Sequence, residues 1–424
     1  MKDVIAIILA AGRGTRMKSG TPKVLHKILG KPIIGYVLDA VKDAGVTDTV
    51  TVAGYGSDEL KKVLGASKVT IQKKLLGSGD AVLAAKPKLG GYSGDLLIIC
   101  GDTPLVKSGT IKALIDKHKD SKASLTVLTA EMRNPTGYGR ILRDDNGRIT
   151  KIVEEVEAGL YEEVVKEINV GTYCCKAQDL FAALTEVKPD NKKEEIFLTD
   201  VVAILRRKEK LIESVTTKDP DEAIGINTRK DLARATTVMK NAIMEELMDS
   251  GVTVEDPDST TIYPDVKIGA DTVIHPNTLI ESGVKIGRNC RIGPFARLRP
   301  GTTIADNVEV GNFVELNRTA VAGGTKIKHH TYLGDAAVGK NVNVGAGTIT
   351  ANYDGRNKNK TVIEDGAFIG VGAILIAPVR IGKNSTVGAG CVVPKNHDVP
   401  KNSIVIGVPA RPYRKRTGKD RRGL

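Results

Sequence analysis

The chain lacks several features that would place it quickly in a class of protein. It has no tryptophan, and aromatic residues make up only 4% of its 424 residues, which argues against the stacking surfaces of single-stranded nucleic-acid binders. No apolar run approaches the roughly twenty residues of a membrane-spanning helix. The amino terminus has no basic stretch followed by a cleavage site. We therefore expect a soluble, cytoplasmic protein with neither nucleic acid nor membrane as a partner.

Cysteine is also scarce. The five cysteines show no paired spacing and two of them are adjacent, so the sequence predicts neither a disulfide framework nor a zinc site. We expect them to be small buried hydrophobic residues. They are Cys100, Cys174, Cys175, Cys290 and Cys391.

Acidic residues are nearly missing from the carboxyl-terminal segment 411–424. It has seven basic residues against Asp420, so it carries +6 of the net charge of +13. Two interpretations stay open: a solvated, disordered end, or a segment that binds phosphate. The basic residues are Arg411, Arg414, Lys415, Arg416, Lys419, Arg421 and Arg422.

The most regular feature is a six-residue period of aliphatic residues. A helix repeats its buried face about every 3.6 residues and a strand every 2, so a period of six indicates coils with short flat sides. It is typical of a left-handed parallel β-helix of hexapeptide repeats, expected here over residues 252–410. A turn-rich insertion at 353–360 interrupts it, and such insertions tend to fall on the functional face. The inward positions are Ile262, Ile268, Ile274, Ile280, Ile286, Ile292, Leu298, Ile304, Val310 and Leu316, then Ile327, Leu333, Val338 and Val344 in a slipped register, then Ile363, Ile369, Leu375, Ile381, Val387 and Val393.

The preceding residues, 1–227, alternate strand and helix patterns. This order predicts an α/β, doubly wound, Rossmann-like domain with a parallel sheet. The expected strands cover 4–10, 49–53, 96–100 and 125–129, and the expected helices include 34–44 and 79–86.

A long helix is expected over residues 228–251, between the two domains. Thr228 and Asp231 form a capping box, and the helical spacing ends at Gly251. It is either a connecting arm or the last helix of the first domain. The expected parts of the chain are thus 1–227, 228–251, 252–410 and 411–424.

A glycine-rich loop follows the first expected strand. Residues 9–17 read Leu-Ala-Ala-Gly-Arg-Gly-Thr-Arg-Met, and Pro22 and Lys23 come next. Such a loop at the end of a parallel strand lets backbone N–H groups approach phosphates, and Arg16 and Lys23 add positive charge. The loop lacks the third glycine of a dinucleotide fingerprint and the Gly-Lys-Ser/Thr of a P-loop.

Asp102 directly follows the expected strand 96–100. Its carboxylate is therefore expected at the sheet edge where ligands bind, as a metal ligand or as a cap. Mg²⁺ takes one or two protein oxygens together with substrate phosphates, so Asp102 and one further oxygen would be enough.

These motifs, in this order, resemble the bifunctional N-acetylglucosamine-1-phosphate uridylyltransferase / glucosamine-1-phosphate N-acetyltransferase family over nearly the whole chain. The loop with Arg16 and Lys23 matches the family's catalytic nucleotide loop, and the Gly-Asp-Thr-Pro-Leu segment at 101–105 matches as well. The resemblance implies Mg²⁺ held by Asp102 and Asn227. It implies nucleotide and sugar contacts at Leu9, Ala10, Gly12, Gly14, Lys23, Gln72, Gly77, Ser78, Gly139, Glu154, Asn169 and Asn227.

The resemblance also implies a second site in the β-helix. His329, within Lys-His-His-Thr-Tyr, matches the family's general base, whereas its neighbours alone would also allow an exposed basic turn. An imidazole suits the removal of a proton from an attacking amine. A homotrimer with active sites between subunits is implied as well. The implied contacts with the acetyl acceptor and coenzyme A are Arg299, Asn317, Tyr332, Asn343, Ala346, Asn352, Tyr353, Val371, Ala389 and Arg411.

Three positions depart from the family pattern. Asn317 replaces a lysine that helps to hold the sugar phosphate, Val371 replaces a serine, and Gly407 replaces an arginine. Arg318 is a possible substitute for the missing lysine, although a neutral Asn317 loses a charge-assisted hydrogen bond. Arg411 is a possible partner for the phosphates of the coenzyme.

We expect acetyl transfer from acetyl-CoA to glucosamine 1-phosphate, then Mg²⁺-dependent uridylyl transfer from UTP to N-acetylglucosamine 1-phosphate. One alternative is a nucleotidyltransferase whose β-helix serves assembly or another acyl acceptor, against which His329 and Tyr332 argue. The other is a non-catalytic scaffolding subunit, against which Lys23, Asp102 and Asn227 argue.

Overall fold

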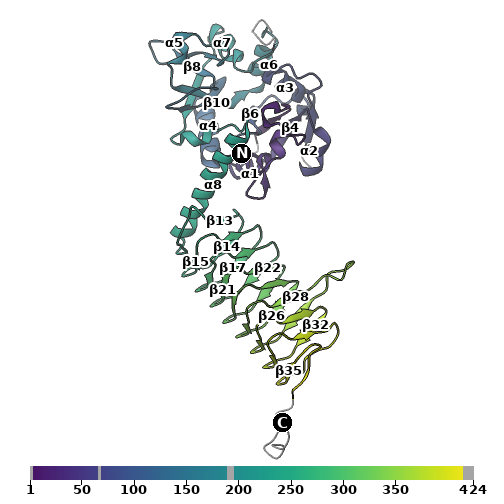
Figure 1. Cartoon of the computed structure of the whole chain (residues 1–424). Helices are drawn as coiled ribbons and strands as arrows, with labels where there is room; N and C mark the ends of the chain where they lie inside the picture. The colour runs from purple at the N-terminus through teal and green to yellow at the C-terminus, as the bar shows by residue number, and fades with distance from the viewer. Residues whose placement is uncertain (1–2, 65–67, 189–194, 414–424) are drawn as a thin grey trace, which may run out of the picture. The chain divides into compact units, whose positions relative to one another are not determined.

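The computed structural model describes residues 3–64, 68–188 and 195–413, and the chain divides into two compact units (Figure 1). The units are Met1–Val238 and Met239–Leu424. Their boundary falls inside helix α8 (Arg229–Asp249), which contributes residues to both. The basic residues of the tail from Arg414 to Arg422 lie outside the described residues, so the two interpretations of the tail stay open.

The first unit is built on a sheet of order β11-β7-β10-β6-β1-β4-β5, with β8 and β9 attached to β10. The strands are β1 (Val4–Ala10), β4 (Asp48–Ala53), β5 (Lys68–Ile71), β6 (Asp95–Cys100), β7 (Leu125–Glu131), β8 (Arg140–Arg143), β9 (Ile149–Val153), β10 (Glu167–Lys176) and β11 (Ile212–Thr216); a separate pair is β2 (Lys27–Ile28) and β3 (Lys31–Pro32). The predicted Rossmann-like α/β class is confirmed. The predicted parallel order does not hold at β10, which runs antiparallel to β6 and β7. It also pairs antiparallel with β8, and antiparallel neighbours do not need the long crossover that joins parallel strands.

Helices cover the sheet and leave one core on each of its faces. The helices are α1 (Ile33–Asp43), α2 (Ser57–Leu64), α3 (Ser78–Ala85), α4 (Ser108–Ser121), α5 (Leu160–Glu163), α6 (Ala177–Leu184) and α7 (Asp200–Arg207), with short 3₁₀ turns η1 (Thr15–Met17), η2 (Lys23–Leu25), η3 (Lys86–Leu89) and η4 (Pro220–Ala223). In β6, Leu96 belongs to one core and Leu97 to the other. Burial on both faces explains why this strand reads as an unbroken apolar run. No helix in the described part of the chain is long and apolar enough to cross a membrane.

Leu97→Ala is expected to lower the free energy of unfolding of the first unit by about 2–5 kcal/mol, because it leaves a cavity under a central strand. Leu160→Ala is the matched control: Leu160 is 84% exposed in α5, and the change should stay within about 0.5 kcal/mol. Urea denaturation followed by circular dichroism at 222 nm measures both, because α1 to α7 all belong to this unit. Equal losses in the two variants would contradict the assignment of this core.

The second unit is a parallel β-helix whose coils contribute one short strand to each of three sheets. The first sheet contains β12 (Thr253–Val254), β15 (Val273–Ile274), β18 (Arg291–Ile292), β21 (Glu309–Asn312), β24 (Lys326–His329), β27 (Asn343–Val344), β30 (Phe368–Ile369), β33 (Thr386–Val387), β35 (Ile404–Ile406) and β36 (Arg411–Pro412). The second contains β13 (Thr261–Ile262), β16 (Leu279–Ile280), β19 (Arg297–Leu298), β22 (Glu315–Asn317), β25 (Tyr332–Gly334), β28 (Ile349–Ala351), β31 (Ile374–Ile376) and β34 (Val392–Val393). The third contains β14 (Lys267–Ile268), β17 (Lys285–Ile286), β20 (Thr303–Ile304), β23 (Ala320–Val321), β26 (Ala336–Val338), β29 (Thr361–Ile363) and β32 (Val379–Ile381). The predicted hexapeptide β-helix is confirmed.

The slipped register arises because coils change length on one of their three sides. Ile286 pairs with Ile304, 18 positions later, whereas Ile304 pairs with Val321, 17 positions later. The next coil is again one residue short, and the one after it, from Val338 to Ile363, holds the insertion. Each of these three changes in length falls between the second and third sheets. We call this side of the coils the variable corner.

Candidate functional sites

The nucleotide loop opens onto a cavity of about 400 Å³ at the carboxyl ends of β1 and β6. It is lined by Leu9, Ala10, Ala11, Gly12, Arg13, Lys23, Val24, Gln72, Leu75, Gly77, Ser78, Ala81, Cys100, Asp102 and Glu195. The structure therefore gathers most of the residues predicted to bind the nucleotide around one space. These residues come from the loop after β1, from η2, from the segment before α3 and from the end of β6.

Two glycines stand in tight surroundings here, Gly77 in the cavity wall and Gly14 beside Lys23. Gly14 has φ of +60°, and a Cβ there would lie 2.7 Å from the Cβ of Lys23. Gly77 has φ of +103°, and a Cβ there would lie 2.6 Å from the carbonyl oxygen of Ile196. A larger residue at either position would have to move backbone or side chain, because both φ values also favour glycine.

Lys23 joins the two residues predicted to hold Mg²⁺. Its Nζ donates to Asp102 Oδ2 and, at 3.0 Å, to Asn227 Oδ1. The backbone holds the two segments together, because the Ile226 amide donates to the Asp102 carbonyl oxygen at 2.9 Å. The predicted capping box supports Asn227, since Asp231 Oδ2 accepts from the Asn227 amide at 3.0 Å.

The donor set at this point suits a hard cation. One carboxylate and one amide oxygen already converge on a single positive charge, the Lys23 ammonium. Magnesium prefers oxygen ligands and often uses one or two from the protein, with phosphates and water completing its shell. The described residues contain no group of three or more His, Cys, Asp or Glu that could hold a metal, so a cage made by the protein alone is not found there.

Gln72 and Ser78 lie deeper in the same wall. The buried Gln72 amide donates to the Gly77 carbonyl at 3.0 Å and to Asp80 Oδ2 at 2.7 Å. Both donations use the amide nitrogen and hold the group in one orientation. The amide oxygen is then the atom that Gln72 can offer to a ligand as a hydrogen-bond acceptor. Ser78 Oγ accepts from the Leu198 amide at 2.9 Å, which fixes the start of α3.

Gly139 and Asn169, both predicted to contact the sugar, are hydrogen-bonded to each other. The Asn169 amide donates to the Gly139 carbonyl at 2.9 Å, and Asn169 Nδ2 donates to the Tyr173 hydroxyl at 2.6 Å. Burial raises the pKa of the Cys100 thiol to about 12, with a further contribution from the negative charge of Asp102 and a smaller one from Glu154. Asp102, predicted to bind the metal, and Glu154, predicted to contact the sugar, therefore both act electrostatically on Cys100.

Arg16, predicted to be catalytic, lies away from the lining of this cavity. It is exposed in η1 and does not line the cavity, whereas Arg13, between the two loop glycines, does. Sequence reasoning singled out Arg16 and missed Arg13. The signal was its place inside Gly-Arg-Gly, where the backbone turns toward the cavity.

In the β-helix, three Gly-x-Gly segments line up at one corner. Ala346, Val371 and Ala389 each stand between two glycines on successive coils. The Gly372 amide donates to the Ala346 carbonyl and the Gly390 amide to the Val371 carbonyl, both at 2.7 Å. We call this row, which lies between the first and second sheets, the Gly-x-Gly edge. It brings together three of the residues predicted to contact the acetyl donor and acceptor.

His329 ends β24 at the same corner. Its Nδ1 lies 2.7 Å from Asn312 Oδ1, and the two residues are register partners in neighbouring coils. An amide oxygen only accepts, so this contact places the proton on Nδ1 and leaves Nε2 with its lone pair. Sequence reasoning missed Asn312, because its role depends on pairing between coils 17 residues apart.

A second cluster lies at the variable corner. Arg318 Nε and Nη2 donate to the two oxygens of Asp335, at 2.6 and 2.9 Å, and Arg318 Nη1 donates to Asn317 Oδ1 at 3.0 Å. Asn352 Nδ2 donates to Asp335 as well. The pKa of Asp335 is lowered, chiefly by its hydrogen bond from Arg318. A Cβ on Gly334 would lie within 3.0 Å of the Tyr332 hydroxyl and of Asn352 Nδ2, so this glycine makes room for both side chains.

The other residues predicted to contact the acetyl acceptor or coenzyme A belong to neither of these two clusters. Arg299 Nη1 donates to Glu315 Oε1 at 2.8 Å, and Tyr353, 60% exposed, donates to the Gly355 carbonyl at 2.7 Å. Asn343 begins β27, and Arg411 lies exposed in β36. Gly407 has φ of +86°, which a side chain in place of hydrogen would strain.

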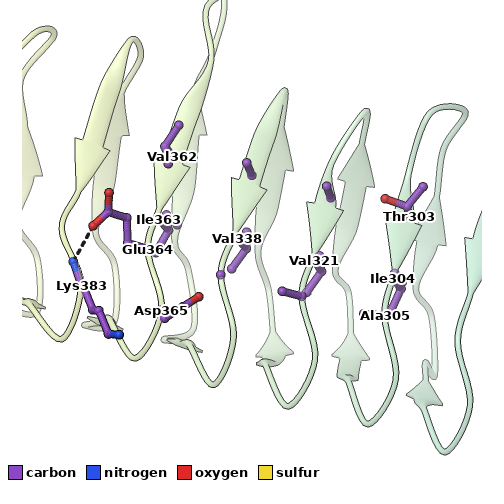
Figure 2. A pocket seen from close by; sticks show the side chains of 14 residues that line it. Thr303, Ile304, Ala305, Val321, Val338, Val362, Ile363, Glu364, Asp365 and Lys383 are labelled. Carbon is purple, nitrogen blue, oxygen red and sulfur yellow. Dashed lines mark hydrogen bonds between the residues drawn. The ribbon is translucent and has the colours of Figure 1, made fainter.

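A groove of about 580 Å³ lies elsewhere, on the outer face of the third sheet (Figure 2). Figure 2 shows Val321, Val338 and Ile363 on successive coils behind it. Its lining includes Ala320, Ala337 and other small residues of the shortened coils, and none of the predicted site residues.

Comparisons with known proteins agree with the division of the chain into two units. The description "MobA-like NTP transferase domain" matches residues 6–198, and "Bacterial transferase hexapeptide (six repeats)" matches residues 283–318 and 360–395. Proteins named "Bifunctional protein GlmU" match along the chain. The one from Pelotomaculum thermopropionicum is 43% identical over 89% of this chain and 90% of its own length. The relative from Heliobacterium modesticaldum is 43% identical over 95% and 94%, and that from Shouchella clausii is 43% identical over 96% of both chains.

Matches at this identity cover 89–96% of the chain and therefore include residues of both units. The family expected from the sequence motifs is thus confirmed, together with its two kinds of transferase activity, nucleotidyl and acetyl transfer. This chain belongs to the GlmU family of bifunctional proteins.

Proposed function

We propose that the protein makes UDP-N-acetylglucosamine in two steps, each in its own unit. The second unit transfers an acetyl group from acetyl-CoA to glucosamine 1-phosphate, and the first transfers a uridylyl group from UTP to the product. The observation that carries this proposal is that one chain holds both a cavity with Lys23, Asp102 and Asn227 and a corner with the His329–Asn312 pair.

In uridylyl transfer, a phosphate oxygen of N-acetylglucosamine 1-phosphate attacks the α-phosphorus of UTP. The new P–O bond forms as the bond to the pyrophosphate leaving group breaks. The nucleophile is already an anion, so the protein has to position the groups and neutralise charge rather than remove a proton. Lys23 and the loop amides near Gly12 and Gly14 suit this task. Gln72 offers its amide oxygen to the N3–H of uracil, which favours uracil over cytosine, whose N3 is an acceptor.

Asp102 and Asn227 are the residues we assign to Mg²⁺. When bound, Mg²⁺ supplies positive charge for the phosphates and orients them. Glu154 and Asn169 suit the hydroxyl and amide groups of the sugar, and the charge of Glu154 acts on Cys100, which lines the nucleotide cavity.

In acetyl transfer, the amine nitrogen of glucosamine 1-phosphate attacks the thioester carbon. A C–N bond forms, the C–S bond breaks, the thiol of coenzyme A leaves, and Nε2 of His329 takes the amine proton. The Gly-x-Gly edge suits the coenzyme arm, because the glycines on both sides of each central residue let an extended chain approach the backbone. The polar groups of Arg299, Tyr332 and Asn352 suit the sugar phosphate. All three guanidinium nitrogens of Arg318 already donate hydrogen bonds to Asp335 or Asn317. We therefore assign Arg318 to stabilising the variable corner and not to binding the sugar phosphate in place of the missing lysine.

We also propose that the protein is a homotrimer. His329 lies at one edge of the second sheet and the Arg318–Asp335 cluster at the other, on opposite sides of β25. His329 and Asp335 are six positions apart, a span of up to roughly 20 Å, which is too long for a direct proton transfer. A neighbouring copy that presents its Gly-x-Gly edge to the variable corner would join the two groups. Sedimentation of the full chain at a monomer mass would oppose this arrangement.

Two assays on the full chain test the proposal. Thiol release from acetyl-CoA with glucosamine 1-phosphate should occur, and pyrophosphate release from UTP with N-acetylglucosamine 1-phosphate should require Mg²⁺. Pyrophosphate release without thiol release would favour a nucleotidyltransferase whose β-helix serves assembly. A cytoplasmic location stays a prediction.

Asn312→Leu should lower kcat for acetyl transfer about 10- to 100-fold, as is typical for the loss of a group that orients a functional histidine. Without the amide oxygen at 2.7 Å, the ring is free to carry its proton on Nε2, the wrong atom for a base. The KM for acetyl-CoA should change little. Uridylyl transfer by the same variant is the internal control and should be unchanged; a wild-type kcat for acetyl transfer would contradict the role of Asn312.

A further inference from the structure

One feature of the nucleotide cavity goes beyond its catalytic assignment. The single ammonium of Lys23 contacts both oxygens assigned to Mg²⁺, Asp102 Oδ2 and Asn227 Oδ1. These contacts are shielded from water: the Lys23 side chain is 13% exposed and that of Asp102 is 20% exposed. An ion pair that is partly withdrawn from solvent is screened less than a surface pair.

An ammonium and a divalent cation compete for these two oxygens. Mg²⁺ binds oxygen at about 2.0–2.1 Å, and a lysine nitrogen that keeps its hydrogen bonds to the same atoms would lie within about 4 Å of the ion. The two positive charges would then repel each other in a partly buried setting. Each cation therefore weakens the binding of the other at these oxygens.

The Lys23 ammonium can move away from these oxygens toward the nucleotide loop. It stands on a flexible four-carbon stem that passes directly over Gly14, where a Cβ would lie 2.7 Å from the Lys23 Cβ. The stem is therefore packed against the loop that faces the phosphates, and it lines the same cavity as Gly12 and Arg13. A small rotation of the stem moves the ammonium from the oxygen pair toward the loop without any change in the backbone.

We propose that Lys23 is an internal competitor of the metal: its ammonium holds Asp102 and Asn227 until nucleotide phosphates draw it away. The identity of the nucleotide rests on the proposed uridylyl transfer, whereas the competition rests only on the contacts of Lys23. Free divalent cation then binds the protein weakly, and nucleotide and metal strengthen each other's binding by the same factor. This exchange would also keep the partly buried Asp102 carboxylate paired with a cation at every stage.

The test is Mn²⁺ binding to the full chain without nucleotide, measured by the electron paramagnetic resonance signal of free Mn²⁺. Lys23→Met keeps a stem of similar length and removes the charge. It should bind Mn²⁺ at least about tenfold more tightly than the wild type. The double variant Lys23→Met, Asp102→Asn should lose that gain, because the freed carboxylate is then missing.

Arg13→Met is the matched control. It removes the same charge from the same cavity, but Arg13 makes no contact with Asp102 or Asn227 among the described residues. Equal tightening in Arg13→Met and Lys23→Met would reduce the effect to general electrostatics and overturn the proposal, as would unchanged affinity in Lys23→Met. If Lys23→Met does not fold, as judged by its circular dichroism, Lys23→Gln carries the same test. Tight Mn²⁺ binding by the variant together with no pyrophosphate release by the wild type would refute the proposed function and leave the competition standing.

Discussion

His329→Ala is expected to lower acetyl transfer by about 10²- to 10⁴-fold, the contribution typical of a positioned general base. The attacking amine must lose a proton as the C–N bond forms. His329 has its Nδ1 engaged by Asn312 Oδ1 at 2.7 Å, so Nε2 is the atom that can accept this proton. Alanine leaves neither nitrogen in place, and a water molecule is a much weaker base. Initial rates of thiol release from acetyl-CoA measure the effect.

His397→Ala is the control for this variant. His397 is also exposed on the β-helix, but its Nδ1 lies 3.0 Å from the Lys395 carbonyl oxygen, away from the Gly-x-Gly edge. It should retain the wild-type rate. Pyrophosphate release should be normal in both variants, because it occurs in the other unit. A rate within threefold of wild type in His329→Ala would remove this residue from the mechanism.

Asp102→Asn is expected to lower uridylyl transfer by at least about 10²-fold, and to raise the Mg²⁺ concentration needed for half-maximal rate. The substitution keeps the shape of the side chain but removes the negative charge that the Lys23 ammonium and, in our proposal, Mg²⁺ contact in turn. Pyrophosphate release at several Mg²⁺ concentrations measures both effects.

Asp39→Asn serves as its control. Asp39 also pairs with a lysine, Lys31, but its side chain is 61% exposed, and surface pairs of this kind contribute little. Acetyl transfer by Asp102→Asn should equal that of the wild type, which would show that the chain is folded. A variant that keeps full uridylyl transfer at low Mg²⁺ would contradict the assignment of Asp102.

The sequence predicted those parts of the fold that depend on local pattern. The strand at Leu96 to Cys100 reads as apolar throughout because both its faces are buried, and the β-helix reads as a period of six because one residue per side points inward. The direction of β10 was not predictable in the same way. Its residues suit either direction, and its antiparallel pairing with β6, β7 and β8 depends on contacts between segments far apart in the sequence.

The same distinction applies to the candidate sites. Residues in one short motif, such as Gly12 and Gly14, were predicted by their spacing. Asn312, by contrast, becomes the partner of His329 only because one coil is a residue short, which sets their register at 17 positions. Likewise, Arg318 was expected to be available to a phosphate, and the structure shows it engaged by Asp335. Contacts between coils join residues about 17 positions apart, so patterns among neighbouring residues do not predict them.

The variable corner has a consequence for how such enzymes can diversify. Among the coils from Val310 to Ile381, the spacing between inward residues changes only there, to 5, 5 and 13 positions, while the other two sides keep six. The strands before and after each change still pair in register. Residues can therefore be added or removed at this corner without changing how the strands of neighbouring coils pair. Engineering of a new acyl acceptor would best begin with loop length at this edge, because the scaffold already tolerates such edits and its core need not be redesigned.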